Sequence, residues 1–235
     1  GGAKPPSLPP GAHQIHEYLY LVWVLGARPE PLPPHICVTP EEIAAARQKF
    51  GLSGRADGKS DWIGLNPGAE YGPAKRWPVE NFAGAAIELA RQTGCRLAIF
   101  GGPGDAELTK GLEERIRAGA KEAGTNPETT SLAGKTSLRE LCATLACCRL
   151  VVTNDTGPMH LAAAVGTPVV VPYGSTAPDL TAPGLPGDPR HQLLRSTAPC
   201  APCFLRECPI DFRCLRGIAV GQVVEAALRV WKKRE

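Results

Sequence analysis

The sequence predicts an α/β fold in which a parallel β-sheet carries helices on both faces. From Asp61 onward, apolar segments of strand length alternate with longer segments of helical pattern. Chains that alternate in this way fold as βαβ units, whose strands run parallel and whose helices cover the sheet. With 235 residues, 43% of them hydrophobic, the chain can form one large domain, or one domain plus pieces of another.

Two helices are expected before the sheet. Residues 1–12 are rich in proline and glycine and indicate a loop or linker. Residues 13–25 are apolar and partly aromatic, which favours a helix. Residues 39–42 then combine a threonine for the N-cap, a proline for the first turn and two acids, a typical helix start. This second helix is expected to reach Phe50, since Gly51 follows it.

The alternating region supplies the sheet and its covering helices. Glycines end two of the helical segments, at Gly94 and Gly166, and the Ser137–Glu140 spacing matches a capping box. The predicted strands are residues 62–66, 96–100, 149–152 and 168–172, with a short strand at 131–132. The predicted helices are residues 81–92, 106–118, 137–148, 158–164 and 222–232.

Composition and charge exclude several classes of protein. The formal net charge is +3 and both signs are mixed along the chain, so there is no basic stripe of the kind that binds nucleic acid. No apolar run reaches the ~20 residues that a membrane-spanning helix needs. The chain starts without methionine or a signal-peptide pattern, and we expect that this is not the natural N-terminus.

The cysteines favour a reducing compartment. Cys142, Cys147 and Cys148 fall in an apolar helical pattern, where a reduced cysteine behaves as a small buried hydrophobic residue. Disulfides are rare in the cytosol, so free thiols of this kind are typical of a cytoplasmic protein.

The turn after residues 149–152 carries the most informative chemistry. It contains Asn154, Asp155, Thr156 and Gly157 and leads into an apolar helix in which His160 lies one turn along. Open α/β sheets bind ligands at the carboxyl ends of their strands. A helix N-terminus also attracts anions, so the turn can hold a sugar phosphate or a nucleotide.

Two more polar loops follow predicted strands, and all three loops are expected to meet at one sheet edge. Loop 67–78 carries Lys75 and Arg76, two cations suited to a diphosphate. Loop 101–105 is rich in glycine and ends in Asp105, which can accept hydrogen bonds from ribose hydroxyls. Each feature alone has a plainer interpretation: solvated cations, helix N-caps or a core histidine. Together they favour a nucleotide-sugar site.

These motifs resemble glycosyltransferase family 9, the bacterial heptosyltransferases. The matching segments are the run Pro-Gly-Ala-Glu-Tyr-Gly-Pro-Ala-Lys-Arg-Trp-Pro at 67–78 and the run Asn-Asp-Thr-Gly-Pro-Met-His-Leu-Ala at 154–162. The Cys-rich tail from Pro199 to Leu215 resembles the heptosyltransferase II subfamily, and the similarity extends from about Gln14 to the end of the chain.

The resemblance implies a GT-B enzyme, with two Rossmann-like domains and an active site in the cleft between them. Residues 1–50 would be a remnant of the N-terminal acceptor domain with linker helices. Residues 51–221 would be the donor-binding domain, including a Cys-rich excursion at 199–216, and residues 222–235 a C-terminal helix. The second domain would therefore be incomplete in this chain.

The resemblance also implies roles for the site residues. Lys75, with Arg76, would contact the donor diphosphate and stabilise the leaving group. The turn Asn154, Asp155, Thr156 and Gly157 would hold the phosphates and the heptose hydroxyls, with His160 beside the same pocket.

The remaining donor contacts implied by the resemblance lie on neighbouring loops. Asp105 would bind the ribose and Thr136 would lie near the adenine edge. Residues 173–176, after the next strand, would close the pocket.

By the same resemblance, the reaction would be an inverting, metal-independent transfer of heptose from ADP-heptose to the inner core of lipopolysaccharide. No cofactor would be required. The general base would be an aspartate of the N-terminal domain, outside this chain. The protein would be cytoplasmic, with peripheral contact at the inner membrane and no nucleic acid partner.

Four further cysteines, Cys200, Cys203, Cys208 and Cys214, lie within 15 residues of one another. Four thiolates can hold a structural zinc ion, although the spacing lacks the paired CxxC knuckles of common zinc ribbons. An iron–sulfur site is a second interpretation. The plainest interpretation is a loop of reduced or partly disulfide-bonded cysteines that stiffens a surface excursion.

Two other functions remain open at this point. A nucleotide-sugar epimerase of GT-B architecture would need acid and base carboxylates around the sugar, and no such cluster stands outside the motifs above. A sugar-nucleotide-binding module without turnover is the non-enzymatic alternative. A dehydrogenase is disfavoured, because the GxGxxG spacing and its later acid are missing.

Overall fold

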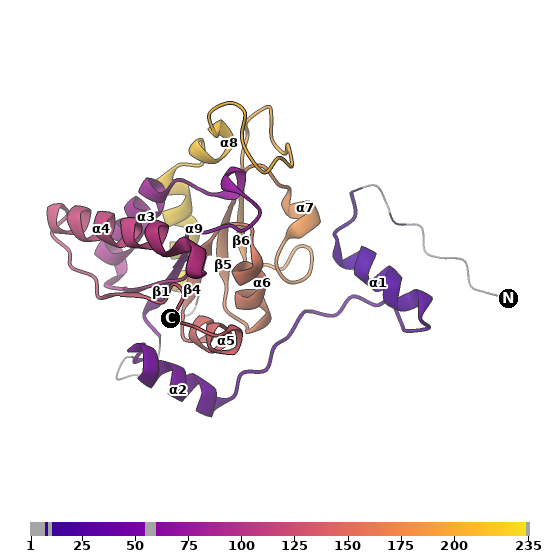
Figure 1. Cartoon of the computed structure of the whole chain (residues 1–235), viewed down its shortest axis with the longest axis horizontal. Coiled ribbons are helices and arrows are strands. Elements are labelled where there is room, and N and C mark those ends of the chain that lie inside the picture. Colours follow the sequence, from indigo (N-terminus) through magenta and orange to yellow (C-terminus); the bar gives the residue numbers. More distant parts are fainter. Residues whose placement is uncertain (1–7, 9–10, 55–59, 234–235) are drawn as a thin grey trace.

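The computed structural model describes residue 8 and residues 11–54 and 60–233. Its centre is a six-stranded sheet in the order β3-β2-β1-β4-β5-β6, and every neighbouring pair is parallel. The strands are β1 Trp62–Asn66, β2 Arg96–Ile99, β3 Thr129–Ser131, β4 Leu150–Thr153, β5 Val169–Tyr173 and β6 Gln192–Arg195. The predicted α/β class is confirmed (Figure 1).

Helices connect these strands and flank them. The α-helices are α1 Ile15–Val24, α2 Pro40–Phe50, α3 Val79–Thr93, α4 Ala106–Glu122, α5 Leu138–Ala146, α6 Gly157–Ala164, α7 Pro178–Thr181, α8 Arg213–Arg216 and α9 Val220–Lys232. Two 3₁₀ turns, η1 Pro73–Lys75 and η2 Pro103–Asp105, lie in the loops after β1 and β2. The predicted N-cap at Thr39 and the predicted capping box at Ser137 both form: Glu42 N donates to Thr39 Oγ1, and Glu140 N donates to Ser137 Oγ. Local sequence therefore sets these helix starts.

The sequence prediction missed or misplaced several elements. The short strand predicted at 131–132 lies at Thr129–Ser131, where its polar side chains are only partly buried. Strand β6 and helices α7 and α8 were not predicted. Strand β6 has two leucines between polar ends and pairs only with β5, so its pattern is weak. Helices α7 and α8 have four residues each, too few to show the hydrophobic periodicity of a helix.

The sheet separates two hydrophobic cores, as the doubly wound pattern requires. On one face α3, α4 and α9 pack through residues such as Phe82, Leu112 and Trp231. On the other face α2, α5 and α6 pack through residues such as Leu145 and Met159. Side chains of β1, β4 and β5 point alternately into the two cores, so these central strands are buried on both faces.

The ends of the chain join this domain to different degrees. Helix α9, predicted as a separate C-terminal segment, packs in the core with α3. Helix α2 also belongs to the domain, because it packs on α5. Helix α1 buries none of its residues and is fastened mainly at its start, where Gln14 N donates to Leu180 O at 3.0 Å. Figure 1 shows α1 standing apart from the sheet.

Within the described part of the chain, none of the helices combines the length and the apolar character needed to cross a membrane.

The strand order places the topological switch point of the sheet at the neighbouring strands β1 and β4. The chain proceeds outward from β1 through β2 to β3, and then returns to the other side of β1 as β4. The loops after β1 and β4 therefore diverge to opposite faces of the sheet. Such a switch point is where open α/β sheets bind ligands, at the carboxyl ends of the strands.

Two glycines test how tightly the cores are packed. A Cβ on Gly64 in β1 would lie 2.8 Å from Phe100 Cε2 and 2.9 Å from a Val151 methyl group. We expect Gly64→Ala to lower the free energy of unfolding by about 1–3 kcal/mol, the usual cost of overpacking. Gly221 on α9 faces open space, so Gly221→Ala should raise that free energy by about 0.5–1 kcal/mol. Urea unfolding of both variants measures these effects. An unchanged free energy of unfolding in Gly64→Ala would contradict the close packing around Gly64.

Candidate functional site

The buried side chain of Asn154 fixes the loop that follows β1. Its Nδ2 donates to Pro67 O at 2.8 Å, and its Oδ1 accepts from Trp77 N at 3.0 Å. Asn154 thus holds both ends of the loop at the carboxyl end of β4. Asn154 was expected to bind the donor, but in the structure these bonds to the loop occupy both polar atoms of its side chain.

Trp77 anchors the same loop from the other side. Its indole Nε1 donates to Ile218 O at 3.0 Å, and its ring packs edge-on against Phe82 at 5.1 Å between centroids. Lys75 lies two residues before this buried anchor, in η1. The backbone that carries Lys75 is therefore held by the core.

Lys75 forms an ion pair with Asp155, the residue that follows Asn154. Lys75 Nζ lies 2.9 Å from Asp155 Oδ2, and the two side chains are only 14% and 5% exposed. The same oxygen accepts from Thr176 Oγ1 at 2.7 Å and from Thr181 Oγ1 at 3.2 Å. A buried pair of charges is stable only when further hydrogen bonds satisfy it, and the two threonines supply these.

This arrangement leaves one carboxylate oxygen available. Asp155 Oδ1 accepts no hydrogen bond from the described residues, while Oδ2 accepts three. Lys75 is likewise an ammonium with three donors, one of which is directed at Asp155. A ligand that carries both an anion and hydroxyl groups can therefore bind both members of the pair.

The start of α6 lies directly after this pair. Thr156 is the N-cap residue, but no side chain caps the helix, and Gly157 has open space where a Cβ would lie. The plainer interpretation, in which the side chains of Asp155 and Thr156 cap this helix, is therefore wrong. Pro158 has no N–H and Met159 N donates to Thr156 O, so the Gly157 N–H is the donor of residues 157–159 that remains for an anion.

A cavity of about 310 Å³ opens beside the same turn. Three of the predicted site residues line it: Asp105, Thr136 and Thr156. Its other walls are largely apolar and come from the loops after β1, β2 and β3 and from the first turn of α5. They include Phe100, Pro103, Leu138, Leu141 and Pro158. The cavity thus offers an apolar slot with a carboxylate and hydroxyl groups at its edge.

Asp105 lies where the loops after β1 and β2 meet. Its Oδ2 accepts from Gly102 N at 2.9 Å, and it makes no side-chain cap to α4, so the N-cap interpretation of Asp105 is wrong for that helix. A Cβ on Gly68 would lie 2.7 Å from Asp105 Oδ1. Only glycine therefore lets the first loop pass this close to the carboxylate.

In the residues that the structure describes, Arg76 and His160 form no hydrogen bond to the Lys75–Asp155 pair and have other surroundings. The exposed Arg76 donates from a guanidinium nitrogen to Ala69 O at 3.2 Å, within its own loop. His160 lies in a separate groove of about 340 Å³ together with His13 and Thr181. Although His160 is exposed by surface area, crowding by neighbouring atoms desolvates its ring and lowers its pKa. The ring is therefore neutral near pH 7.

Several lining residues had no signal in the sequence. Thr181 lies on the unpredicted helix α7, so its bond to Asp155 could not be foreseen. Glu70 and Leu141 line the cavity, and Leu138 lines it while being 70% exposed, a large exposure for a leucine. For Glu70, its position in the loop 67–78 was the one sequence feature that indicated a place near the cavity.

The four clustered cysteines are all free thiols. Cys208 Sγ accepts from Phe212 N at 3.2 Å, and backbone N–H groups, chiefly those of Ile210 and Phe212, lower the pKa of this thiol. Among the described residues, no three His, Cys, Asp or Glu side chains are arranged so that they could hold a metal ion. As arranged here, the cysteines do not fit the predicted zinc site.

Residues 5–212 match the sequence model of glycosyltransferase family 9 (heptosyltransferase). The match covers most of the chain, including every loop described above. The chain belongs to glycosyltransferase family 9.

Curated family members are similar over the same region. Lipooligosaccharide heptosyltransferase 2 of Haemophilus influenzae is 40% identical over 152 residues, which are 65% of this chain and 42% of the relative. Lipopolysaccharide heptosyltransferase 2 of Escherichia coli is 36% identical over 156 residues, covering 66% and 42%. The chain thus spans less than half the length of these relatives.

Solved structures of the family have the same fold. The structure of E. coli ADP-heptose lipopolysaccharide heptosyltransferase II matches with a TM-score of 0.68 and 29% identity, covering 87% of this chain and 56% of that one. A family 9 glycosyltransferase from Veillonella parvula matches with a TM-score of 0.72 and 27% identity, covering 94% and 61%. The sheet described here is therefore part of a GT-B-type structure.

Metal analysis tests the cysteine cluster. Because the four thiols do not surround a common point, we expect protein purified without added zinc to contain far less than one zinc or iron ion per chain. Elemental analysis by mass spectrometry measures this content. A stoichiometry near one that disappears in Cys203→Ser, but stays in Cys95→Ser at a buried thiol elsewhere, would show that the cluster rearranges around a metal.

Proposed function

We propose that this chain carries the donor site of a heptosyltransferase that transfers heptose from ADP-heptose to the inner core of lipopolysaccharide. The observation that carries the proposal is the Lys75–Asp155 pair at the uncapped start of α6, next to the apolar cavity. Relatives named heptosyltransferase 2 support the choice of sugar and acceptor.

In this proposal the nucleoside part of the donor occupies the cavity. Adenine lies between apolar side chains such as Pro103 and Leu138, with Thr136 at its edge. The free oxygen of Asp105 accepts from the ribose hydroxyls. A flat apolar slot with a few polar groups is the usual form of such a site.

The diphosphate then extends toward the start of α6. Lys75 and the Gly157 N–H at the start of α6 bind its oxygens and stabilise the negative charge that grows on the departing ADP. Asp155 holds Lys75 through Oδ2 and accepts from heptose hydroxyls through Oδ1. His160, which is neutral, lies beyond Thr181 on the sugar side.

The reaction is a single displacement with inversion. The acceptor oxygen attacks the anomeric carbon while the bond from that carbon to the phosphate oxygen breaks, and ADP leaves. The acceptor proton passes to a general base, an aspartate in the part of the relatives that this chain does not span. Lysine supplies the positive charge, so the reaction needs no metal ion. The enzyme acts on the cytoplasmic side of the inner membrane, as a peripheral protein.

A second candidate is a nucleotide-sugar-binding module without turnover. The observation in its favour is that the site carboxylates already have partners: Asp155 accepts from Lys75, Thr176 and Thr181, and Asp105 accepts from Gly102 N. Both candidates share the donor site, and they differ only in whether this chain alone completes the reaction.

Calorimetric titration with ADP, UDP and GDP tests the donor site. We expect ADP to bind best, and we expect Lys75→Ala to weaken ADP binding by about 10-fold or more, since a charge-assisted contact to phosphate is lost. Lys49→Ala is the matched control, because Lys49 also pairs with a carboxylate but lies outside the site. Chelation by EDTA should leave the affinity unchanged. Equal affinity for all three nucleotides would contradict the donor assignment.

A transfer assay separates the two candidates. With ADP-heptose and a lipopolysaccharide acceptor, we expect this chain to bind donor but to produce little or no transfer product, because the base lies outside it. Mass spectrometry of the acceptor measures the product. Turnover at the rate of a full-length family member would contradict this expectation.

A further inference from the structure

The Cys-rich excursion, residues 199–216, is bonded directly to the loop that carries Lys75. Ala74 N donates to Arg206 O at 3.0 Å, and Arg206 Nε donates to Tyr71 O at 2.7 Å. Tyr71 OH donates to Phe204 O at 2.9 Å, across 133 positions of sequence. Three hydrogen bonds therefore join the two segments, and the first involves the residue next to Lys75.

The ring of Tyr71 adds a second connection. The Lys75 ammonium lies 5.0 Å from the centroid of this ring, and the Arg206 guanidinium lies 5.3 Å from the same centroid. Cations are attracted to an aromatic face at these distances. Tyr71 therefore contacts both the lysine of the site and the arginine of the excursion.

Gly72 permits this close approach. Its φ of 150° is unfavourable for other residues, and a Cβ there would collide with the carbonyl oxygen of Arg206. The segment between Tyr71 and Ala74 thus follows the excursion closely at a position where only glycine fits.

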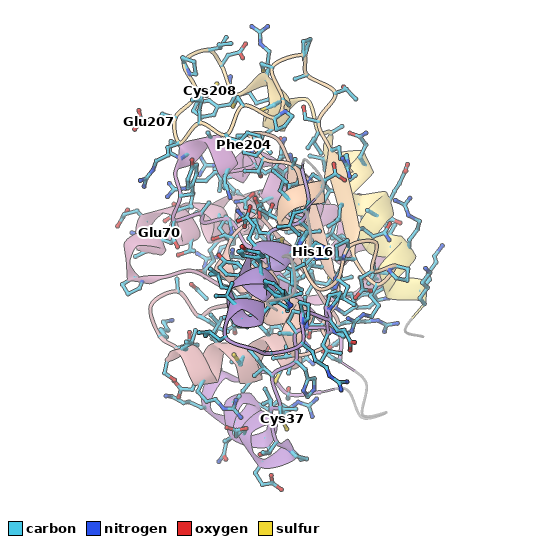
Figure 2. The ribbon with its side chains drawn as sticks, turned by 90° about the vertical axis from the view of Figure 1, so that its right-hand side faces the viewer. His16, Cys37, Glu70, Phe204, Glu207 and Cys208 are labelled. Carbon is cyan, nitrogen blue, oxygen red and sulfur yellow. The ribbon has the colours of Figure 1, made fainter. Side chains whose placement is uncertain are left out.

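The excursion also contacts the loop on the opposite side of the ion pair. Phe204 N donates to Ser175 O at 2.7 Å, and Ser175 precedes Thr176, which donates to Asp155. A Cβ on Gly174 would lie 3.0 Å from Cys214 Sγ, so the end of the excursion packs on β5 as well. Figure 2 shows Phe204 and Cys208 together at one end of the molecule. The excursion therefore bridges the loop of Lys75 and the loop that supports Asp155.

We propose that Arg206 is a positioning residue for Lys75, and that the excursion serves to hold the Lys75 loop in its diphosphate-binding conformation. The inference rests on the proposed function, which assigns Lys75 to the donor diphosphate. Lysine has a long flexible side chain and loses much rotamer freedom when it is ordered. A lysine that is already ordered by Tyr71 and Asp155 loses less on binding, so its ligand binds more tightly.

Binding measurements on variants test the role of Arg206. Arg206→Ala removes the charge-assisted hydrogen bond from the guanidinium to Tyr71 O. We expect this loss to weaken ADP binding about fivefold and to leave adenosine binding unchanged. In a Lys75→Ala background the same substitution should have almost no further effect, because it acts through Lys75. Arg213→Ala is the matched control, since Arg213 lies in the same excursion and, across the described ranges of the chain, its side chain pairs with Asp211 and not with the Lys75 loop.

Hydrogen–deuterium exchange tests the connection without any ligand. Gly72→Ala keeps every charged side chain but forces the loop away from Arg206, so the amide of Ala74 should exchange at least several-fold faster. Gly221→Ala, a glycine facing open space on α9, should leave this exchange unchanged. Thermal melting checks whether both variants fold. If Gly72→Ala does not fold, Arg206→Ala replaces it in the exchange measurement, where loss of the bond from Arg206 Nε to Tyr71 O should speed exchange in the same loop.

The outcomes separate this inference from the proposed function. Weaker ADP binding in Arg206→Ala that disappears in the Lys75→Ala background supports the inference. Unchanged ADP binding in Arg206→Ala, while Lys75→Ala still weakens it, overturns the inference and leaves the proposed function intact. Equal effects with and without Lys75 also overturn it. If the unmodified chain binds no nucleoside diphosphate, the proposed function fails. If the Ala74 amide also exchanges at an unchanged rate in Gly72→Ala, the role of the excursion in holding the Lys75 loop is overturned as well.

Discussion

The hydrogen bonds of the buried Asn154 side chain are the interaction on which the site depends. They bind the beginning and the end of the loop after β1 to the end of β4. Each buried polar group that lost its partner would cost about 1–3 kcal/mol, so the loop cannot leave this path cheaply. Because Lys75 lies in that loop and Asp155 follows Asn154, one side chain brings the two charges together.

The ion pair is then completed from elements that are distant in sequence. Thr176 and Thr181, after β5, satisfy the Asp155 carboxylate, while the excursion near Arg206 contacts the backbone beside Lys75. A buried pair without such partners would be destabilising. The sheet therefore holds the loops in place, and the loops hold Lys75 and Asp155 together. The Cys-rich excursion adds hydrogen bonds to the loop that carries Lys75.

Much of the fold was predictable because its strands and helices have strong local patterns. The helix starts at Thr39 and Ser137 follow from capping residues, and the buried strands follow from continuous apolar runs. Strand β6 was missed because an edge strand with polar ends has little pattern, and α7 because four residues carry no period. For the site, Lys75, Asp155 and Asp105 were singled out from loop position and Thr136 from the family resemblance, but Thr181 and most of the cavity walls were not.

The sequence by itself determined the parallel α/β class, the family motifs and the loops that carry the candidate site, since all of these are local in the chain. Only the tertiary structure decided what each side chain does. It showed Asn154 bonded to the loop after β1, Arg76 donating to Ala69 O in its own loop, and the Cys-rich excursion contacting the Lys75 loop. Such pairings join residues up to 135 positions apart, and their hydrogen bonds depend on distances that no local pattern encodes.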